Sequence, residues 1–533
     1  MDLSNFWWSG AGGGPGPGPD PGDPVGESLR FRGAQQQLLA FESFPSTTKV
    51  DACFSFWIKL GVQTTSTTSL YQSMLCYSRQ SGGIDFRISN NGQFHDGAVH
   101  PGTQYYRDNS GWYHCFIRYT ESSGLQEVYV NGVLQYSNSY SYSNALNGTR
   151  LEIGNTMAYP SSYFQYVGYM ADYHYVYGQS LSPETFGRFN AKGVWVPVDP
   201  GKDGDTTWYG ANGFHLTFPP GNIGRDQSGN GNDFTATGFE TTDQTSPNYD
   251  IVQDSPTNNF ATINPLHYND GVALVINDAN LSSSTTGGAP TPASTHIITG
   301  KTYVEFYECN YYVGIWRADV WDTTDFVGFR PDEFGIYYAP GSVWSNSVQT
   351  GASTSSFATS DVLALTYDPD TGEAHFYINN VVQNSGNPIH TLTPSEQYVF
   401  VLNQQSAKGY INCGQQPFRY TPPAGFLALS TANMPTDELP DTITGEFIGN
   451  SNADGPFVYT GCIPARIQYG TIDVKYQDRF GQTNVDFLSN GFKVRSTTSN
   501  SGTVNYTVTT THDGGEYDGN KVPFQSPAPA VSN

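Results

Sequence analysis

Short runs of aromatic and β-branched residues, each followed by turn-forming residues, recur along the chain from Ser28 onward. Runs of strand length occur at 54–60 (FSFWIKL), 112–119 (WYHCFIRY) and 128–134 (VYVNGVL). Asn131-Gly132 in the last run is a preferred dipeptide of two-residue hairpins. Strands joined by tight turns need this pattern, so we expect an all-β fold of antiparallel strands.

The composition supports this expectation and excludes other classes of fold. The 533 residues include 58 Gly and 33 Pro, which long helices do not tolerate, and charged residues make up only 14%. The 9 Trp, 36 Tyr and 32 Phe can bury a core, which argues against a disordered chain. At about 100–200 residues per domain, the length predicts three or four units.

The charge balance limits the partners. The chain has 48 Asp and Glu against 24 Lys and Arg, a net charge of −24, and contains no Lys/Arg-rich run. Nucleic acid and anionic membrane surfaces are therefore not expected as main partners. The first residues lack the pattern of a secretion signal, and the longest aliphatic run, 272–276, is too short to cross a bilayer. We expect a soluble chain without membrane insertion.

The six cysteines show no C-x-x-C pair and no Cys/His spacing typical of a zinc site. Each lies among apolar residues, so buried thiols are the favoured interpretation and disulfides the alternative. They are Cys53, Cys76, Cys115, Cys309, Cys413 and Cys462.

Residues 1–25 have the composition of an extended tether. A glycine-rich run is followed by alternating Pro and Gly up to Pro21, a sequence that cannot build a core. Phe6, Trp7 and Trp8 precede it, and nothing nearby in sequence can bury these three rings. We interpret 1–25 as an attachment peptide whose aromatic residues anchor in a partner protein, with a disordered leader as the alternative.

Residues 26–195 carry a first resemblance. The three strand runs above occur in the same order as in the laminin-G-like or concanavalin-A-like lectin fold, followed by a closing strand at 166–177 and a short helix signal at 182–186. The region resembles that family, which implies a β-sandwich of concanavalin-A-like, jelly-roll type.

Residues 196–254 are expected to form a linker region. Asp226, Ser228 and Asn230 alternate with glycines there, which fits either an oxygen-ligand calcium loop or a Gly/Asn-rich turn. This loop, D-x-S-G-x-G-N-D at 226–233, and the segment SPTNNFATINPL at 255–266 together resemble a linker recurrent in bacteriophage tail and fibre proteins.

Two further regions follow. Residues 255–435 contain strands at 301–308 and 313–315 and a strand–turn–strand pattern at 362–380, in an order that resembles the SPRY-type sandwich of phage proteins. Residues 436–533 are similar to the small β-domain that follows that sandwich in the same proteins. The expected architecture is therefore a series of tandem antiparallel β-sandwiches behind an extended N-terminal peptide.

No motif for catalysis is found. The E-x-D-x-E and E-x-D-x-x-E patterns of β-sandwich hydrolases are absent, and Glu305 and Glu308 should fall on opposite faces of their strand. No nucleophile elbow, P-loop or H-E-x-x-H motif occurs. We therefore expect no enzyme activity, no catalytic residue, no resident metal and no cofactor.

Two other features carry weaker signals. His95, His100, His114 and His174 are interpreted as surface or core histidines rather than ligands. The stretch 136–144, rich in Tyr, Ser and Asn, fits either glycan contact or packing against a neighbouring subunit.

The resemblances imply a virion structural protein of a bacteriophage, assembled in the host cytoplasm. The favoured form is a tail fibre or adhesin-like appendage that attaches through its N-terminus to other virion proteins and binds host-surface glycans. A capsid decoration or head-fibre protein is the alternative, and a polysaccharide depolymerase is less favoured. Because the chain is rich in aromatic and poor in charged residues, we also expect subunit interfaces in a homo-oligomer, a homotrimer above all.

Overall fold

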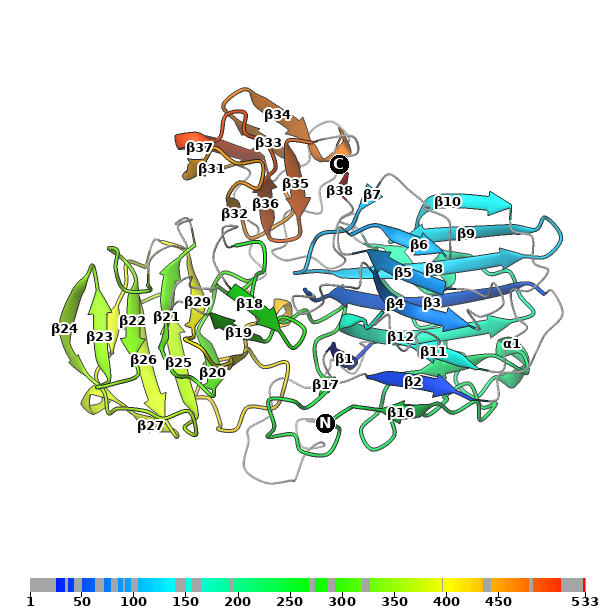
Figure 1. The fold of residues 1–533 in the computed structure, drawn as a ribbon, viewed down its shortest axis with the longest axis horizontal. Helices are drawn as coiled ribbons and strands as arrows, with labels where there is room; N and C mark the ends of the chain where they lie inside the picture. Colours follow the sequence, from blue (N-terminus) through cyan, green and yellow to red (C-terminus); the bar gives the residue numbers. More distant parts are fainter. Residues whose placement is uncertain are drawn as a thin grey trace, which may run out of the picture.

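The computed structural model describes the greater part of residues 25–509. The described ranges are 25–33, 37–42, 50–62, 71–77, 85–89, 92–96, 104–139, 150–155, 164–190, 195–267, 274–285, 293–318, 326–394, 396–434, 442–478, 483–509 and 531–532. These ranges form three β-rich bodies (Figure 1), and their strand pairs are antiparallel apart from two isolated bridges.

The first body is a two-sheet sandwich. Its larger sheet has the order β10 (Val133–Ser139), β9 (Leu125–Val130), β8 (Trp112–Thr120), β3 (Ala52–Leu60), β12 (Val167–Tyr177), β1 (Ser28–Arg32) and β17 (Ile251–Val252), with β15 (Phe214–Leu216) paired to β12. The facing sheet has the order β16 (Thr235–Thr237), β2 (Leu38–Phe41), β11 (Leu151–Ile153), β4 (Tyr71–Tyr77), β5 (Asp85–Ser89) and β6 (Phe94–Asp96). Alternate residues such as Phe54, Phe56 and Tyr173 fill the core between them, where the Phe56 and Tyr173 rings stack at 4.5 Å.

The segment 196–254, expected as a linker, belongs instead to this sandwich. β15 pairs with β12, β16 pairs with β2, and β17 pairs with β1. These strands have three residues or fewer, which is too short for alternation to show in the sequence. A helical turn, α1 (Thr206–Tyr209), and the ribbon of β13 (Gly187–Phe189) and β14 (Trp195–Pro197) complete the region.

The second body is a further two-sheet sandwich. One sheet has the order β18 (Leu274–Asn277), β19 (Ser282–Thr285), β30 (Gly409–Asn412), β20 (Thr302–Tyr307), β25 (Leu363–Asp368), β26 (Glu373–Ile378) and β27 (Val381–Val382), with β28 (His390–Thr391) on β26. The other has the order β24 (Val348–Ser353), β23 (Ser342–Ser345), β22 (Phe334–Tyr337), β21 (Tyr312–Arg317) and β29 (Tyr398–Asn403). Val304, Phe306 and Val313 are among the buried residues between them.

The third body is small and also built from two sheets. One has the order β31 (Thr442–Asn450), β37 (Ser501–Thr509), β33 (Arg466–Tyr469) and β34 (Ile472–Lys475). The other has the order β32 (Phe457–Tyr459), β36 (Gly491–Val494) and β35 (Val485–Leu488), and Phe447, Phe487 and Phe492 lie in the core. A last strand, β38 (Val531–Ser532), pairs with β7 (Gln104–Tyr105) of the first sandwich.

The fold confirms the predicted class, an all-β chain of tandem antiparallel sandwiches. The predicted strands match β3, β8, β12, β20, β25 and β26, and the predicted helix signal is the 3-10 turn η2 (Pro183–Thr185). Asn131 and Gly132 connect β9 and β10 with φ values of 51° and 74°, as the hairpin prediction requires. Among the described residues, no helix is long and apolar enough to span a membrane.

The described residues also form the short 3-10 turns η3 (Asn384–Gly386), η4 (Thr431–Asn433) and η5 (Tyr476–Asp478).

Candidate functional site

The outer face of the larger sheet in the first sandwich carries a group of one aspartate and two histidines close enough together to be considered as a metal site. On this face His174 of β12 lies opposite Ser55 of β3, and Trp57 lies opposite His114 of β8. Phe186 and Tyr209, from the segment that follows β12, cover the face and pack against Phe116 and Val176. The histidines 114 and 174 therefore lie in a second buried layer outside the sandwich core.

A bulge in β12 turns the key residues toward this layer. The register slips between Ala171 and His174, and Asp172 has a left-handed φ of 50°. The extra residue resets the alternation, so that Tyr173 enters the core while His174 faces outward. β15 then brings His215 directly opposite His174.

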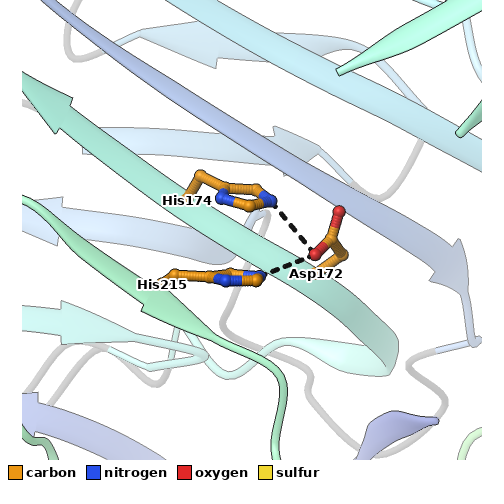
Figure 2. Close-up of side chains that lie close together, drawn as sticks. All are labelled: Asp172, His174 and His215. Atoms are coloured by element: carbon orange, nitrogen blue, oxygen red, sulfur yellow. Dashed lines mark hydrogen bonds and ion pairs between the residues drawn. The ribbon is translucent and has the colours of Figure 1, made fainter. Parts of the chain in front are cut away.

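Asp172, His174 and His215 meet in a compact group (Figure 2). Nε2 of His215 lies 2.8 Å from Oδ1 of Asp172, and Nε2 of His174 lies 3.0 Å from the same oxygen. The contact of His174 has a distance typical of an ion pair but an angle too poor for a hydrogen bond. All three side chains are buried, and the two imidazole rings stack with centroids 3.8 Å apart.

The outer nitrogens of both rings are also held. Nδ1 of His174 is 2.9 Å from the hydroxyl of Tyr209, and Nδ1 of His215 is 2.6 Å from Oδ1 of Asp203. His215 therefore lies between two carboxylates, one buried and one 62% exposed. Contacts of this kind on the second nitrogen also support histidines that bind metals, so the cluster needs a test as a metal site.

The orientation of the rings does not fit one ion bound by both histidines. One ligand atom from each of the three residues lies within 4.8 Å of the others, which is close enough for a shared ion. A metal at about 2.0–2.1 Å from an imidazole nitrogen must lie near the ring plane, because the lone pair lies there. Here the planes are only 13° from parallel, and the rings are stacked face to face. An ion in the plane of one ring would lie well outside the plane of the other.

The cluster is better described as a protonated histidine, His215, held between the carboxylates of Asp172 and Asp203. Burial alone would lower the pKa of His215, but hydrogen bonds to Asp172 and Asp203 raise it to about 9. Burial would raise the pKa of Asp172, but the two imidazoles hold it below its usual value. Burial lowers the pKa of His174, which outweighs the attraction of Asp172. At neutral pH the cluster contains a charged His215 stacked on a neutral His174.

His114 forms a separate, neutral contact on the same face. The indole Nε1 of Trp195 donates to its Nδ1 at 3.1 Å, so its Nε2 carries the proton and donates to Oγ of Ser55 at 2.8 Å. Burial lowers the pKa of His114 to about 3. This histidine is a satisfied core residue, as predicted.

The hydrogen bonds of the Asp226 loop favour the turn interpretation. Oδ1 of Asp226 accepts from the backbone N–H groups of His215 and Ser228, and Oδ2 accepts from the Ser228 hydroxyl and the Asn232 N–H. Each carboxylate oxygen thus already accepts two hydrogen bonds, which leaves no lone pair for a cation. The Asn230 side chain donates to the carbonyls of Gly210 and Gly213 and ties the loop to α1.

The two glutamates considered as a catalytic pair do not form one. Glu305 is buried on β20, and its oxygens accept from the Tyr303 and Tyr307 hydroxyls and from the N–H groups of Arg419 and Tyr420. Burial raises its pKa, and these four bonds oppose the shift. Glu308 lies beyond the end of the strand and is exposed. Glu305 holds the segment 419–420 against the sheet.

Other predicted features have mixed outcomes. Cys53, Cys115, Cys309, Cys413 and Cys462 are buried free thiols, as predicted, and burial raises the pKa of Cys53 to about 12. His95 is buried on β6. Phe6, Trp7, Trp8, His100 and residues 140–144 lie outside the described residues, as does the side chain of Cys76. Residues 136–139 belong to β10, the edge strand of the larger sheet.

The first two sandwiches meet at a buried polar joint, which we define as Lys59, Asp254 and Asn259. The ammonium of Lys59 donates to Oδ2 of Asp254 at 2.7 Å, to Oδ1 of Asn259 at 2.7 Å and to the carbonyl of Phe260 at 2.8 Å. Trp112 Nε1 donates to the second oxygen of Asp254, and Asn259 donates to the carbonyl of Ser110. Burial lowers the pKa of Lys59, and the ion pair with Asp254 opposes that shift.

A second set of contacts extends the same boundary. The hydroxyl of Tyr169 on β12 donates to the carbonyl of Ala279 at 2.8 Å. The side chain of Asn280 accepts from the N–H of Val62 and donates to the carbonyl of Leu60. The two sandwiches are therefore joined by bonds from both sides rather than by a single peptide connection.

Sequence reasoning missed His215, Asp203 and Lys59 as site residues. His215 and Asp203 are brought to His174 by the pairing of β15 with β12, and Lys59 lies 195 positions from Asp254. No local spacing signals such contacts. The bulge at Asp172 likewise has no signature in the run YMADYHYVY.

Comparison with known proteins supports the fold of the first sandwich. Residues 32–185 match the family model described as the concanavalin A-like lectin/glucanases superfamily. No curated protein matches the chain.

Solved structures with partial likeness include a human SPRY domain (12% identity, TM-score 0.22, covering 26% of this chain and 94% of that chain). They also include a putative carbohydrate binding protein from Bacteroides ovatus (14% identity, TM-score 0.28, 40% and 58%) and a SAP-like pentraxin from Limulus polyphemus (15% identity, TM-score 0.24, 30% and 79%). These likenesses are too weak to carry a functional argument. The identification therefore concerns one domain: residues 32–185 match the concanavalin A-like lectin/glucanases superfamily.

Proposed function

We propose that the chain is a non-catalytic structural protein of a bacteriophage particle, a tail fibre or adhesin-like appendage that binds host-surface glycans. The observation that carries the proposal is the buried joint. Of its residues, Asn259 lies in the segment 255–266 and Asp254 comes directly before it. This segment resembles a linker of phage tail and fibre proteins. Here that segment fixes one sandwich against the next, as an extended appendage requires.

Three buried carboxylates support the proposal that the chain is not catalytic. A glycosidase needs two carboxyl groups across one open site, about 5–5.5 or 6.5–9.5 Å apart. Glu305 is buried and saturated by four hydrogen bonds, and Asp226 is likewise saturated. Asp172 is buried against two imidazoles. These groups are used to hold the fold.

Attachment to the particle is proposed to use Phe6, Trp7 and Trp8. Three large aromatic side chains ahead of a Pro/Gly tether place a binding anchor at the end of a flexible arm. A variant with all three replaced by Ser should fold normally and be lost from assembled particles. A variant that shortens the tether by deleting 12–14 and keeps the aromatic residues is the matched control. Normal incorporation of the triple Ser variant would refute the anchor.

The absence of hydrolysis is tested on the purified protein. Incubation with host exopolysaccharide should release no new reducing or unsaturated ends, while binding to whole host cells is retained. Release of oligosaccharide that is lost on replacing one acidic residue would favour a depolymerase instead.

A homotrimer is part of the same proposal. The uncharged edge strand β10, with Val133 and Leu134 each 46% exposed, is a surface that subunit packing would cover. Light scattering should give three times the 58.3 kDa of one chain. A mass of one chain at micromolar concentration would favour a monomeric capsid decoration protein.

A further inference from the structure

A cavity of about 270 Å³ lies where all three bodies meet. Leu60 and Tyr106 of the first sandwich, Leu266 ahead of the second, and Arg495 beyond β36 of the third contribute to its wall. Its volume is just below the range of about 300–1,000 Å³ typical of small-molecule sites, which suits a ligand with a single ring. Junctions between domains are a common place for such sites.

The charge of this cavity is opposite to that of the chain. Arg107, Lys493 and Arg495 line it together with Asp454, and Asp486 pairs with both arginines, so three cations stand against two carboxylates. The whole chain has twice as many acidic as basic side chains. A local excess of cations in a recess raises the local concentration of anions and attracts them from solution.

The cations are held in place before any ligand arrives. Nε of Arg495 is 2.7 Å from Oδ2 of Asp486, and its Nη1 contacts Oδ1 of Asp454. Nη2 of Arg107 is 2.8 Å from the other oxygen of Asp486. These pairs leave Nη2 of Arg495 without a bond to any described residue, so a fixed donor remains for a ligand. Fixed donors lower the entropic cost of binding.

Lys493 adds a buried cation from β36. Its side chain is 2% exposed, and its ammonium donates to the carbonyl of Leu266 at 3.0 Å and lies 3.3 Å from Asp454. Burial lowers its pKa to about 8, against the attraction of Asp454, so Lys493 is still mainly charged at neutral pH.

We infer that this junction cavity binds one anionic sugar, a ring that carries a carboxylate or a phosphate. Arg495 and Lys493 would take the anionic group, and the side chains of Gln72, Ser89 and Asn109 in the wall offer amide and hydroxyl groups to the sugar hydroxyls. The ligand class rests on the proposed glycan-binding role. The site itself rests on the cavity and its charges.

Titration calorimetry on the full chain tests the inference with four probes: glucuronate, glucose 6-phosphate, inorganic phosphate and glucose. Glucuronate or glucose 6-phosphate should bind, and glucose should bind at least tenfold more weakly. Binding of inorganic phosphate without binding of either anionic sugar would show that the anion, not the sugar, is recognised. That result would refute a sugar site. Failure of both anionic sugars to bind at millimolar concentration would overturn the inference.

Two variants locate the binding. Arg495→Lys keeps the charge but removes the Nη2 donor, and Val62→Phe fills the cavity without touching a charge; each should weaken binding at least tenfold. Arg466→Gln is the matched control, because Arg466 pairs with Asp473 on the surface of the same domain and does not line the cavity. Unchanged affinity in both cavity variants would place the ligand elsewhere.

The same variants separate this inference from the proposed function. If binding to host cells survives Arg495→Lys and Val62→Phe, the cavity is not the glycan site, and the adhesin proposal stands. If the wild-type chain binds anionic sugars but no host cells, the cavity site stands and the adhesin proposal fails.

Discussion

The outer face of one sheet carries two buried polar groups that behave differently. At one end of neighbouring strands β3 and β12, Lys59 of the joint gives its three hydrogen bonds to acceptors that come from outside the first sandwich's sheets. Farther along β12, the Asp172–His174–His215 cluster brings one carboxylate and two imidazoles of the same sandwich together. Both bury ionisable groups, but burial lowers the pKa of Lys59 in the joint, whereas hydrogen bonds to two carboxylates raise the pKa of His215 in the cluster to about 9.

The difference lies in what each arrangement does for the molecule. The joint connects two domains through an ammonium that is held by the ion pair with Asp254 and by two further acceptors. The cluster holds β15 and α1, which belong to the segment 196–254, on the first sandwich. Protonated His215 of β15 pairs with Asp172, and His174 contacts the hydroxyl of Tyr209 in α1. The first is expected to set how the sandwiches are held together, and the second how stability depends on pH.

The largest effect is expected from Lys59→Met. This change removes the ammonium and leaves the Asp254 carboxylate buried without its partner, which should lower the free energy of unfolding by about 3–5 kcal/mol. Urea unfolding followed by tryptophan fluorescence measures the loss, because Trp112 donates to Asp254. The matched control is Lys301→Met, because Lys301 is 45% exposed and solvent screens its pair with Asp368, so its loss should cost much less than that of Lys59.

A reciprocal change sharpens this test. Lys59→Met combined with Asp254→Leu removes both charges, so it should recover part of the stability lost in the single variant. If Lys59→Met costs no more than Lys301→Met, the joint does not hold the sandwiches together in the way that we describe.

The second effect concerns pH and His215. Its pKa in the folded protein, about 9, exceeds that of a free imidazole, about 6.5. Protonated His215 therefore stabilises the fold fully below about pH 6.5, and this contribution is lost as the pH rises through 9. This group alone should contribute a loss on the order of 3 kcal/mol of unfolding free energy over that window.

The variant His215→Gln should remove most of this slope when unfolding is measured from pH 6 to 9.5. His114→Gln is the control, because His114 is neutral throughout that range and its loss should leave the slope unchanged. Equal slopes in the wild type and His215→Gln would contradict the charged state that we assign to His215.

The smallest effect is expected from Asp203→Asn. Asp203 is 62% exposed, so solvent screens much of its attraction for His215, and the variant should lose about 1 kcal/mol or less. It should also lower the pKa of His215 without abolishing its rise. NMR titration of the His215 ring measures this pKa, and an unchanged value would show that Asp172 alone sets it.

The sequence predicted the strands well but not the contacts between distant segments. β3 and β8 are long runs of apolar and aromatic residues, and the turn at Asn131-Gly132 is fixed by local backbone preference. Such signals lie within a few residues. The sandwich class followed from them because strands of this composition must bury their faces against another sheet.

The candidate sites depend on pairing across the chain, which no local pattern reveals. The segment 196–254 was interpreted as a linker because it begins with a Pro/Gly connector and contains a Gly/Asn-rich loop, yet the Asp226 carboxylate organises that loop into a turn against α1. The motif at 255–266 was recognised in the sequence, but its partner Lys59 could not be, since the contact depends on how two domains dock.

The most direct test of the central proposal is to express this chain's gene in its native source, purify any virus particles produced there and determine their cryo-EM map. The proposal predicts density for the two sandwiches outside the particle, held at the angle that the joint sets, with the first residues docked in a partner protein at the attachment point. A complete particle without this chain would contradict the proposed function.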